Sequence, residues 1–488
     1  MSFLTILFIL ITLPFTLIRL VRWLAWIQQK EYRLDRFWNF LLSPEGMAEV
    51  VRLAPQKNDF TRVGLKRPAI TIRSTTVGFI SLILMGYLFS LGISFKSWWL
   101  PFLIYALIPL LPAISGLITE IIKSLISLVL LFFAQKKLQK DKPRIIGITG
   151  SYGKTATRHL CSNVISQKFT IYTPPKSHNT PLSIALDLLK HYHGEEILFL
   201  EFAAYKKGEI QKLASWFPPE ISLITGLTPQ HLALFGSLEK IIEAKGELVK
   251  NTQLTGVVLC NAMDPGTEKI CNQDSSKKKI NYSPEKVGLN KEKLDERGRL
   301  SVQWQDQVLK TNLIGLHHTE TIAAAIVLGQ TLEIPPEKIA LGITSFVPKE
   351  VFTQSYFHPT SKALIINDGK TTNPKGFRSA LNLLNHFKKQ GKNTILITGG
   401  IIDLGDESES IHLDLARAAK PIVDFVFYTG SDGKAAFKEV FAQNMVDQST
   451  IFAKLLPKFN QDDVILIEGY VPLNLAKLLQ RNQDKQSD

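Results

Sequence analysis

The chain has 488 residues, which is enough for two or three domains with buried cores of their own. Its formal net charge of +14 at pH 7 and its pI near 9.4 suit either nucleic acid or an anionic membrane surface. The Lys and Arg residues are spread along the chain and concentrate beside apolar N-terminal segments, so we expect a lipid bilayer as the partner and no nucleic acid. Cys161, Cys260 and Cys271 lack CxxC or metal-ligand spacing, which favours a reducing compartment and core or incidental thiols.

Three apolar segments near the N-terminus are about as long as a membrane-spanning helix. In the first, residues 3–27, the basic residues follow the apolar run and no small-residue cleavage site comes after it, which argues against a signal peptide. Residues 76–94 and 98–117 are separated only by Phe95-Lys96-Ser97, which predicts a helical hairpin. The sequence therefore predicts a membrane module over residues 1–140.

The loop between the first two apolar segments is rich in Lys and Arg. The positive-inside rule places this loop in the cytoplasm, and three spans then place the rest of the chain there as well. A fourth apolar stretch, residues 121–133, is short, contains Lys123 and leads into a basic cluster, so we expect it to lie along the membrane interface. These features predict a multi-pass membrane protein whose remaining domains are cytoplasmic.

Beyond Arg144, short β-branched runs alternate with helical stretches, which is typical of α/β layers around a parallel sheet. We expect a central domain over residues 141–346, a smaller Rossmann-like domain over residues 347–480 and a polar tail over residues 481–488. The expected strands are residues 145–149, 197–201, 221–225, 257–260, 363–366, 394–398, 425–428 and 464–467.

The first of these strands runs directly into Gly150-Ser151-Tyr152-Gly153-Lys154-Thr155, and a helix-compatible run follows. Such a glycine turn lets backbone N–H groups and a helix N-terminus converge on phosphate oxygens. Lys154 would neutralise the outer phosphates, and the Thr155 hydroxyl suits Mg²⁺. The general P-loop pattern has glycine where this chain has Ile148, so the loop is a variant of that pattern. The order of strand, loop, Lys-Thr and helix argues against a chance glycine-rich turn.

The stretch from Gly147 to Thr155 resembles the variant P-loop of the Mur ligase family. Further motifs follow in the order of that family, and the stretch from Glu201 to Glu247 is most similar to the member that adds D-alanyl-D-alanine. These motifs are Glu201 at the end of an apolar strand, Gly208-Glu209-Ile210, residues 224–232 with His231, and residues 235–247 with Lys245.

The resemblance implies an ATP-dependent ligase that activates a carboxylate as an acyl phosphate and lets an amine attack it. It implies ATP and one or two Mg²⁺ ions as cofactors, with Thr155, Glu201 and His231 as metal ligands. In the family, the lysine that matches Lys245 is carbamylated and its anion supports the metals; Lys154 and His231 complete the implied catalytic set. Without the family, Glu201 and Lys245 would be read as solvated side chains and His231 as a surface residue.

The motifs of the second half fit the family less well. Residues 315–321 resemble its segment near the adenine, with His318 in place of an asparagine, and residues 367–374 resemble its ribose-side segment, with Asp368 as the nucleotide contact. Glu468-Gly469-Tyr470 stands where the family has Lys-Gly-Ser. The nucleotide site is therefore predicted to comprise the loop at 150–155, His318 and Asp368, while the incoming amine is left open.

Members of the family usually begin with a soluble domain that holds a UDP-sugar, whereas membrane helices occupy that place here. We therefore expect a small-molecule or lipid-linked carboxylate of a peptidoglycan-type precursor, joined to an amino acid or dipeptide on the cytoplasmic side of a bacterial plasma membrane. The loop at residues 174–182 resembles a shortened substrate-contacting loop. Two alternatives are a membrane poly-gamma-glutamate-synthase-like ligase and a nucleotide-binding membrane scaffold with little ligase activity.

Overall fold

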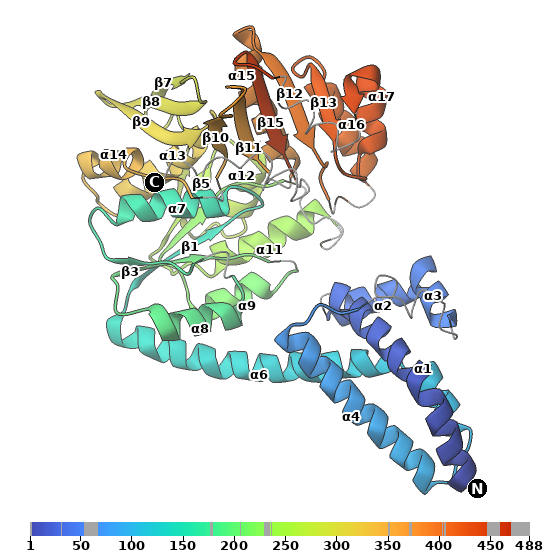
Figure 1. Ribbon diagram of the computed structural model, residues 1–488. Helices are drawn as coiled ribbons and strands as arrows, with labels where there is room; N and C mark the ends of the chain where they lie inside the picture. Colours follow the sequence, from blue (N-terminus) through green and yellow to red (C-terminus); the bar gives the residue numbers. More distant parts are fainter. Residues whose placement is uncertain are drawn as a thin grey trace. The chain divides into compact units, whose positions relative to one another are not determined.

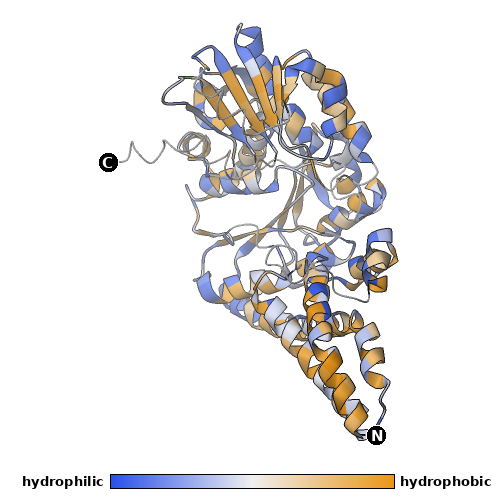
Figure 2. Ribbon diagram, turned by 45° about the vertical axis from the view of Figure 1, so that its right-hand side comes forward, coloured by the Kyte–Doolittle hydropathy of each residue, from blue (hydrophilic) through white to orange (hydrophobic). Residues whose placement is uncertain are grey.

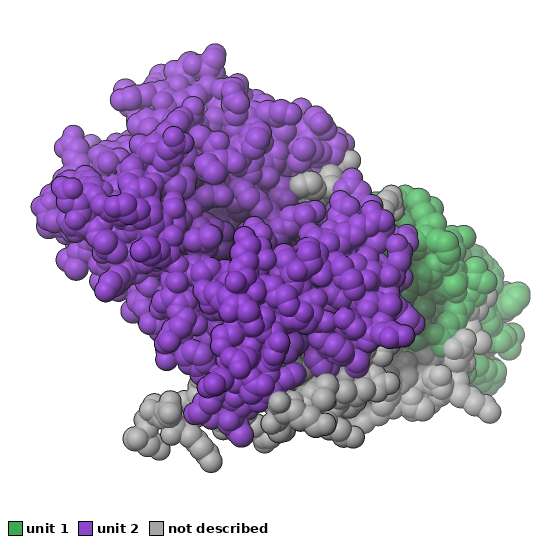
Figure 3. Space-filling model, turned by 90° about the horizontal axis from the view of Figure 1, so that it is seen from above, with its two compact units in different colours: residues 1–130 green, residues 131–488 purple. Residues whose placement is uncertain are grey.

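The chain forms two compact units, residues 1–130 and residues 131–488, which Figure 3 colours separately. Each unit has a hydrophobic core of its own. The computed structural model describes residues 2–30, 32–52, 67–175, 179–204, 206–228, 235, 237–349, 352–369, 373–402, 404, 407–446 and 459–469.

The first unit is built from apolar helices, which Figure 2 shows in orange along most of their length. Its long helices pack through buried side chains such as Trp23, Val77 and Ile104. Among the described residues, three helices are long and apolar enough to cross a membrane, namely Phe3–Gln29, Ile72–Ser94 and Leu110–Asp141. The helices of this part of the chain are α1 (Ser2–Gln29), α2 (Leu34–Leu42), α3 (Pro44–Val51), α4 (Ile72–Ser94), α5 (Leu100–Leu107) and α6 (Leu110–Asp141) (Figure 1).

The third long helix differs from the one predicted. The expected span over residues 98–117 is divided, because α5 ends at Leu107 and α6 begins at Leu110. Pro109 has no N–H to continue the helical ladder, and its ring clashes with the carbonyl one turn earlier, which accounts for the break. α6 then runs without interruption through residues 121–133, so this stretch is helical as predicted and is continuous with the helix before it, and its placement along a membrane interface stays a prediction.

Two arginines within α1 are neutralised or hydrogen-bonded by α3. Arg22 forms a buried ion pair with Glu49 at 2.7 Å. Arg19 donates to the carbonyl oxygens of Val50 at 3.0 Å and Arg52 at 2.5 Å, at the C-terminal end of α3. Buried charges are costly unless they are paired, so these contacts explain how two basic residues lie inside an otherwise apolar helix.

The second unit contains the predicted α/β layers. Its first sheet is parallel throughout, in the order β2-β3-β1-β4-β5-β6. Ile148 of β1 is paired with Glu201 of β3, so the C-terminal ends of these two strands meet at one edge. The strands are β1 (Arg144–Thr149), β2 (Ile171–Tyr172), β3 (Ile197–Glu201), β4 (Ile221–Ile224), β5 (Val257–Asn261) and β6 (Lys278–Tyr282), and the helices around them are α7 (Lys154–Ile165), α8 (Pro181–His191), α9 (Glu209–Trp216), α11 (Leu238–Lys250), α12 (Pro265–Cys271), α13 (His318–Thr331) and α14 (Pro336–Thr344).

A small antiparallel sheet and a second mainly parallel sheet complete this unit (Figure 1). The antiparallel sheet, which was not predicted, joins β7 (Leu289–Leu294), β8 (Arg299–Trp304) and β9 (Gln307–Ile314). The second sheet has the order β10-β11-β15-β12-β13-β14, with β10 antiparallel at its edge. Its elements are β10 (Gln354–Phe357), β11 (Leu364–Asp368), α15 (Pro374–Lys389), β12 (Asn393–Thr398), α16 (Ser408–Ala419), β13 (Phe425–Tyr428), α17 (Lys434–Phe441), β14 (Met445–Val446) and β15 (Asp463–Glu468).

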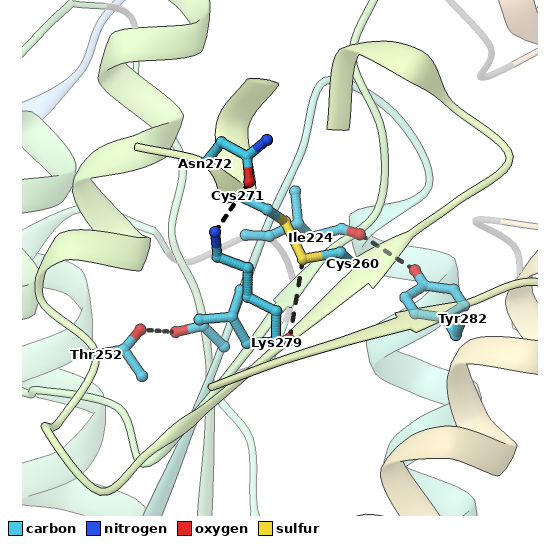
Figure 4. Close-up of a disulfide and its surroundings, with 9 residues drawn as sticks. Ile224, Thr252, Cys260, Cys271, Asn272, Lys279 and Tyr282 are labelled. Carbon is cyan, nitrogen blue, oxygen red and sulfur yellow. Dashed lines mark hydrogen bonds between the residues drawn. A yellow bond between two sulfur atoms is a disulfide. The ribbon is translucent and has the colours of Figure 1, made fainter. Parts of the chain in front are cut away.

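Two of the three cysteines are paired in the structure. Cys260 near the end of β5 and Cys271 at the end of α12 form a disulfide, with their Cα atoms 6.5 Å apart (Figure 4). Cys161 is buried and free. The expectation of incidental thiols is therefore wrong for Cys260 and Cys271, because only the folded arrangement of α12 and β5 brings these two residues together. Cysteine spacing accordingly gives no support for a reducing compartment.

Candidate active site

The predicted phosphate loop connects the C-terminal end of β1 to the first turn of α7. Gly150 has φ +156° and Gly153 has φ +73°, which are backbone conformations that side chains with a Cβ rarely adopt. A Cβ at Gly150 would lie 2.0 Å from the Thr225 hydroxyl oxygen. The first N–H groups of α7 have no partner within the helix, so the loop and the helix together form a site suited to an anion.

Replacement of Gly150 by alanine is expected to distort this loop. The added Cβ would displace Thr225, whose hydroxyl donates to the Tyr152 carbonyl at 2.6 Å. Overpacking of this kind costs about 1–3 kcal/mol. Gly150→Ala should therefore lower the midpoint of thermal unfolding and weaken ATP binding. Gly288→Ala, at a left-handed glycine with open space around it, is the matched control and should keep ATP affinity. Unchanged ATP affinity in Gly150→Ala would contradict the role assigned to the loop.

Two lysines converge on the carbonyl oxygen of Gly150 from different helices. Lys154, in α7, donates to it at 2.8 Å, and Lys245, in α11, donates to it at 3.0 Å. Burial lowers the pKa of Lys154. Burial, followed by the charge of Lys154, lowers the pKa of Lys245 well below its usual range. The structure thus brings two predicted catalytic residues together beneath the loop.

The predicted metal ligands Thr155 and Glu201 also lie together. The Thr155 hydroxyl donates to Glu201 Oε2 at 3.2 Å, and Arg158 Nε lies 3.6 Å from the same oxygen. Hydroxyl and carboxylate oxygens suit Mg²⁺, which completes its octahedral shell with waters and phosphate oxygens. Within the described part of the chain no group of three His, Cys, Asp or Glu side chains is placed to hold a metal. His231, the third predicted ligand, lies outside the described residues.

A cavity of about 330 Å³ opens beside the loop. It is lined by Ser151, Tyr152, Gly153, Lys154 and Thr155 from the loop and the start of α7. Its walls also include the two remaining predicted nucleotide contacts, His318 and Asp368, together with residues that were not predicted, namely Asn261, Tyr282, His317, Glu320, Phe352, Thr353, Asn373, Lys375, Gly376 and Ser379. The volume is in the range of small-molecule sites. Residues far apart in the sequence therefore meet at one cavity, whereas Gly150, Glu201 and Lys245 do not line it.

The surroundings of the predicted nucleotide contacts His318 and Asp368 include buried groups with shifted pKa values. His318 is buried, and burial lowers the pKa of its imidazole well below the usual range, so the ring is neutral near pH 7. Asp368 accepts a hydrogen bond from the Thr353 hydroxyl at 2.9 Å. Glu468 is the cross-strand neighbour of Asp368, and burial together with the Asp368 charge raises the pKa of Glu468 well above its usual range. A buried carboxyl with a raised pKa therefore occupies the position where the family motif has lysine.

Glu247, which the sequence placed only within a motif, has a defined structural role. Its carboxylate accepts from the backbone N–H groups of Gly208 at 2.6 Å and Gln211 at 2.9 Å, at the start of α9. It thereby satisfies the free donors of a helix N-terminus. His412 is likewise buried and accepts from the Ile401 N–H at 3.0 Å, which holds the loop after β12.

A phosphate loop at the C-terminal ends of parallel strands, with two lysines at its Gly150 carbonyl and a threonine–carboxylate pair beside it, defines a P-loop nucleotide-dependent enzyme. Residues 148–329 match the family model of the Mur ligase middle domain, and residues 356–470 match that of the Mur ligase, glutamate ligase domain. Together these matches cover more than half of the chain, and the chain belongs to the Mur ligase family, the ATP-dependent ligases of peptidoglycan synthesis. The resemblance and the α/β fold predicted from the sequence are confirmed.

Relatives of known name agree with this assignment. The UDP-N-acetylmuramoyl-tripeptide–D-alanyl-D-alanine ligase of Bacillus subtilis is 26% identical over 356 residues, which cover 71% of this chain and 77% of that enzyme. MurF from Acinetobacter baumannii superposes with a TM-score of 0.65 at 20% identity, over 73% of this chain and 80% of that one. MurF from Thermotoga maritima in complex with ADP superposes with a TM-score of 0.62 at 23% identity, and the match covers 74% of this chain and 85% of that one. The two structures share the fold of this chain.

Proposed function

We propose that the chain is a membrane-anchored, MurF-like ligase acting on a peptidoglycan-type precursor. An ATP phosphate is transferred to a precursor carboxylate, which gives an acyl phosphate and ADP. An amine then attacks the acyl carbon, phosphate leaves, and the amine loses a proton as the amide forms. The observation that carries this proposal is the single cavity that joins the phosphate loop to His318 and Asp368, with Glu201 and Lys245 directly behind the loop.

The described site residues receive their roles from their surroundings. Lys154 neutralises phosphate charge at the loop, and Thr155 and Glu201 hold Mg²⁺. His231, which lies outside the described residues, is proposed as a further ligand from the family resemblance alone. His318 and Asp368, which line the same cavity as the phosphate loop, bind the nucleoside part of ATP. ATP and Mg²⁺ are the cofactors of the family, and the hard oxygens of Thr155 and Glu201 fit that metal.

Lys245 is proposed to carry a carbamate. Its amine would add to CO₂ and release a proton, so the reaction needs the neutral amine. The lowered pKa of Lys245, caused by burial and by Lys154, favours that form. The resulting anion would lie beside Lys154 and support Mg²⁺ held by Glu201.

Residues 1–140 are proposed to anchor the enzyme in a bacterial plasma membrane, with residues 141–346 as the central domain, residues 347–480 as the C-terminal domain and residues 481–488 as a tail. Three helices of membrane length support the anchor. The basic loop after the first helix supports a cytoplasmic location for both catalytic domains. A lipid bilayer is then a partner, and a lipid-linked or membrane-proximal carboxylate would be held near its site of use.

Amine-dependent phosphate release from the detergent-purified full chain tests this function. The relatives are named for D-alanyl-D-alanine, so this dipeptide is the first amine to supply, with UDP-linked muramyl tripeptide and its lipid-linked form as alternative acids. We expect release only when ATP, Mg²⁺, an acid and an amine are all present. Turnover with L-glutamate as the only added substrate would instead indicate a poly-gamma-glutamate-type ligase, and ATP binding without turnover under any condition would indicate a scaffold.

A further inference from the structure

Lys375 connects the two α/β domains of the second unit at the phosphate loop. It lies in the first turn of α15, after the N-cap residue Asn373. Its ammonium group donates a hydrogen bond to the Tyr152 hydroxyl and lies 4.0 Å from the centre of the Tyr152 ring. It is also 3.6 Å from an oxygen of Asp264 and 3.8 Å from an oxygen of Glu320. A cation of the C-terminal domain is therefore held by three residues of the central domain.

The two carboxylates do not depend on Lys375 for their hydrogen bonds. Asp264 accepts from the Tyr152 hydroxyl at 2.8 Å and from the Leu227 N–H at 3.1 Å, and it caps α12 through the Gly266 N–H at 2.9 Å. Glu320 accepts from the Asn261 amide at 2.8 Å. Lys375 could therefore move away without leaving either carboxylate unsatisfied.

The Tyr152 ring is packed against the backbone, whereas the Lys375 side chain is partly exposed to solvent. A Cβ at Gly226 would lie 2.2 Å from the ring of Tyr152, so the ring is packed directly on the backbone. Lys375 has 35% of its side chain exposed, and its carboxylate distances exceed those of direct hydrogen bonds. The ring and hydroxyl of Tyr152 thus hold the partly exposed ammonium group of Lys375.

The position of Lys375 on its own helix also points toward an anion. A positive side chain in the first turn of a helix is electrostatically unfavourable, because the helix N-terminus is itself positive. Lys375, Gly376 and Ser379 of this helix and its cap Asn373 all line the cavity beside the phosphate loop. The first turn of α15 and its lysine together present positive charge to a cavity that already has Lys154 on its wall.

We propose that Lys375 binds the phosphates of the nucleotide, and that Tyr152, Asp264 and Glu320 hold it ready for that contact when no nucleotide is bound. Nucleotide phosphate would then draw the C-terminal domain onto the phosphate loop through Lys375. This inference rests on the proposed nucleotide site but requires no particular acid or amine. Lys375 is accordingly a nucleotide-binding residue supplied by the second domain.

Direct binding to the detergent-purified full chain tests the inference. Titration calorimetry with ATP and Mg²⁺ is compared with adenosine, which lacks phosphate, in wild type, Lys375→Met, Lys375→Gln and Lys375→Arg. The Met and Gln variants should bind ATP about tenfold or more weakly, because a charge-assisted contact is lost. Adenosine should bind all four proteins equally, and the Arg variant should retain most of the ATP affinity.

Lys388→Met is the matched control. Lys388 lies in the last turn of the same helix, α15, and forms an ion pair with the partly exposed carboxylate of Asp424. It should bind both ligands as wild type does. Equal ATP affinity in Lys375→Met and Lys388→Met, or an equal loss for adenosine and ATP, would overturn the inference. If the wild-type protein ligates normally and Lys375→Met keeps full ATP affinity, this inference alone fails. If the wild-type protein binds no ATP, the proposed function fails as well.

Discussion

Lys154→Ala is expected to abolish ATP turnover almost completely. The variant removes one of the two lysines at the Gly150 carbonyl, and with it a positive charge on the cavity wall. Charge that develops on a transferring phosphate is stabilised by such fixed groups, and loss of one of them lowers kcat by about 100-fold to 1,000-fold. Phosphate release with saturating ATP, Mg²⁺ and amine measures the effect.

Lys190→Ala provides the control for this experiment, because Lys190 is an exposed residue at the end of α8. It should turn over like wild type, and both variants should unfold at similar temperatures. Full turnover by Lys154→Ala would show that the loop does not act on phosphate in this protein, and the ligase function would then fail.

Lys245→Ala is expected to have the second-largest effect, a loss of turnover that formate, acetate or high bicarbonate partly restores. The proposed carbamate places an anion behind the loop, and a small carboxylate that diffuses into the space left by the side chain can replace that charge. Lys250→Ala, at the exposed end of the same helix, should show neither the loss nor the rescue. Full activity in Lys245→Ala would remove this residue from the site.

The pH dependence of wild-type turnover should follow the same lysine. Because the pKa of Lys245 is lowered in the folded protein, the neutral amine that reacts with CO₂ is lost as the pH falls through that lowered value. Activity should therefore decline on acidification and recover slowly when CO₂ is restored at higher pH. The unfolded chain holds this proton more tightly than the folded one, so the Lys245 contribution to the free energy of unfolding increases with pH. In Lys245→Met, that pH-dependent contribution should disappear from unfolding curves.

Local sequence signals predicted the first half of the site. The strand before Gly150, the glycine spacing and the Lys-Thr pair are contiguous in the sequence. The loop could therefore be predicted without knowledge of the fold. Glu201 was predicted at a strand end and lies there, beside Thr155. That parallel strands end at a common edge explains why these motifs converge.

Other features depend on contacts that the sequence does not display. Lys375 is an ordinary residue in the first turn of a helix, and only the packing of that helix against the central domain brings it to Tyr152. The β7–β9 sheet was missed although β8 alternates between buried and partly exposed residues, because its strands are rich in polar and charged residues. The third apolar segment contains Pro109 and Pro112, which can kink a membrane helix but are also tolerated within one, so the sequence alone did not decide whether the segment is divided.

The short helix α12 has a mechanical consequence for the cavity. Its N-cap, Asp264, holds Tyr152, and its last residue, Cys271, is bonded to Cys260, which directly precedes the cavity residue Asn261. Residues 260–271 thus form a covalently closed ring, and closing a loop of about this size restricts the unfolded chain by about 3 kcal/mol. Asn261 and Asp264 are both members of this ring. The cavity residue Asn261 and the Tyr152 partner Asp264 therefore belong to one short segment that the disulfide closes.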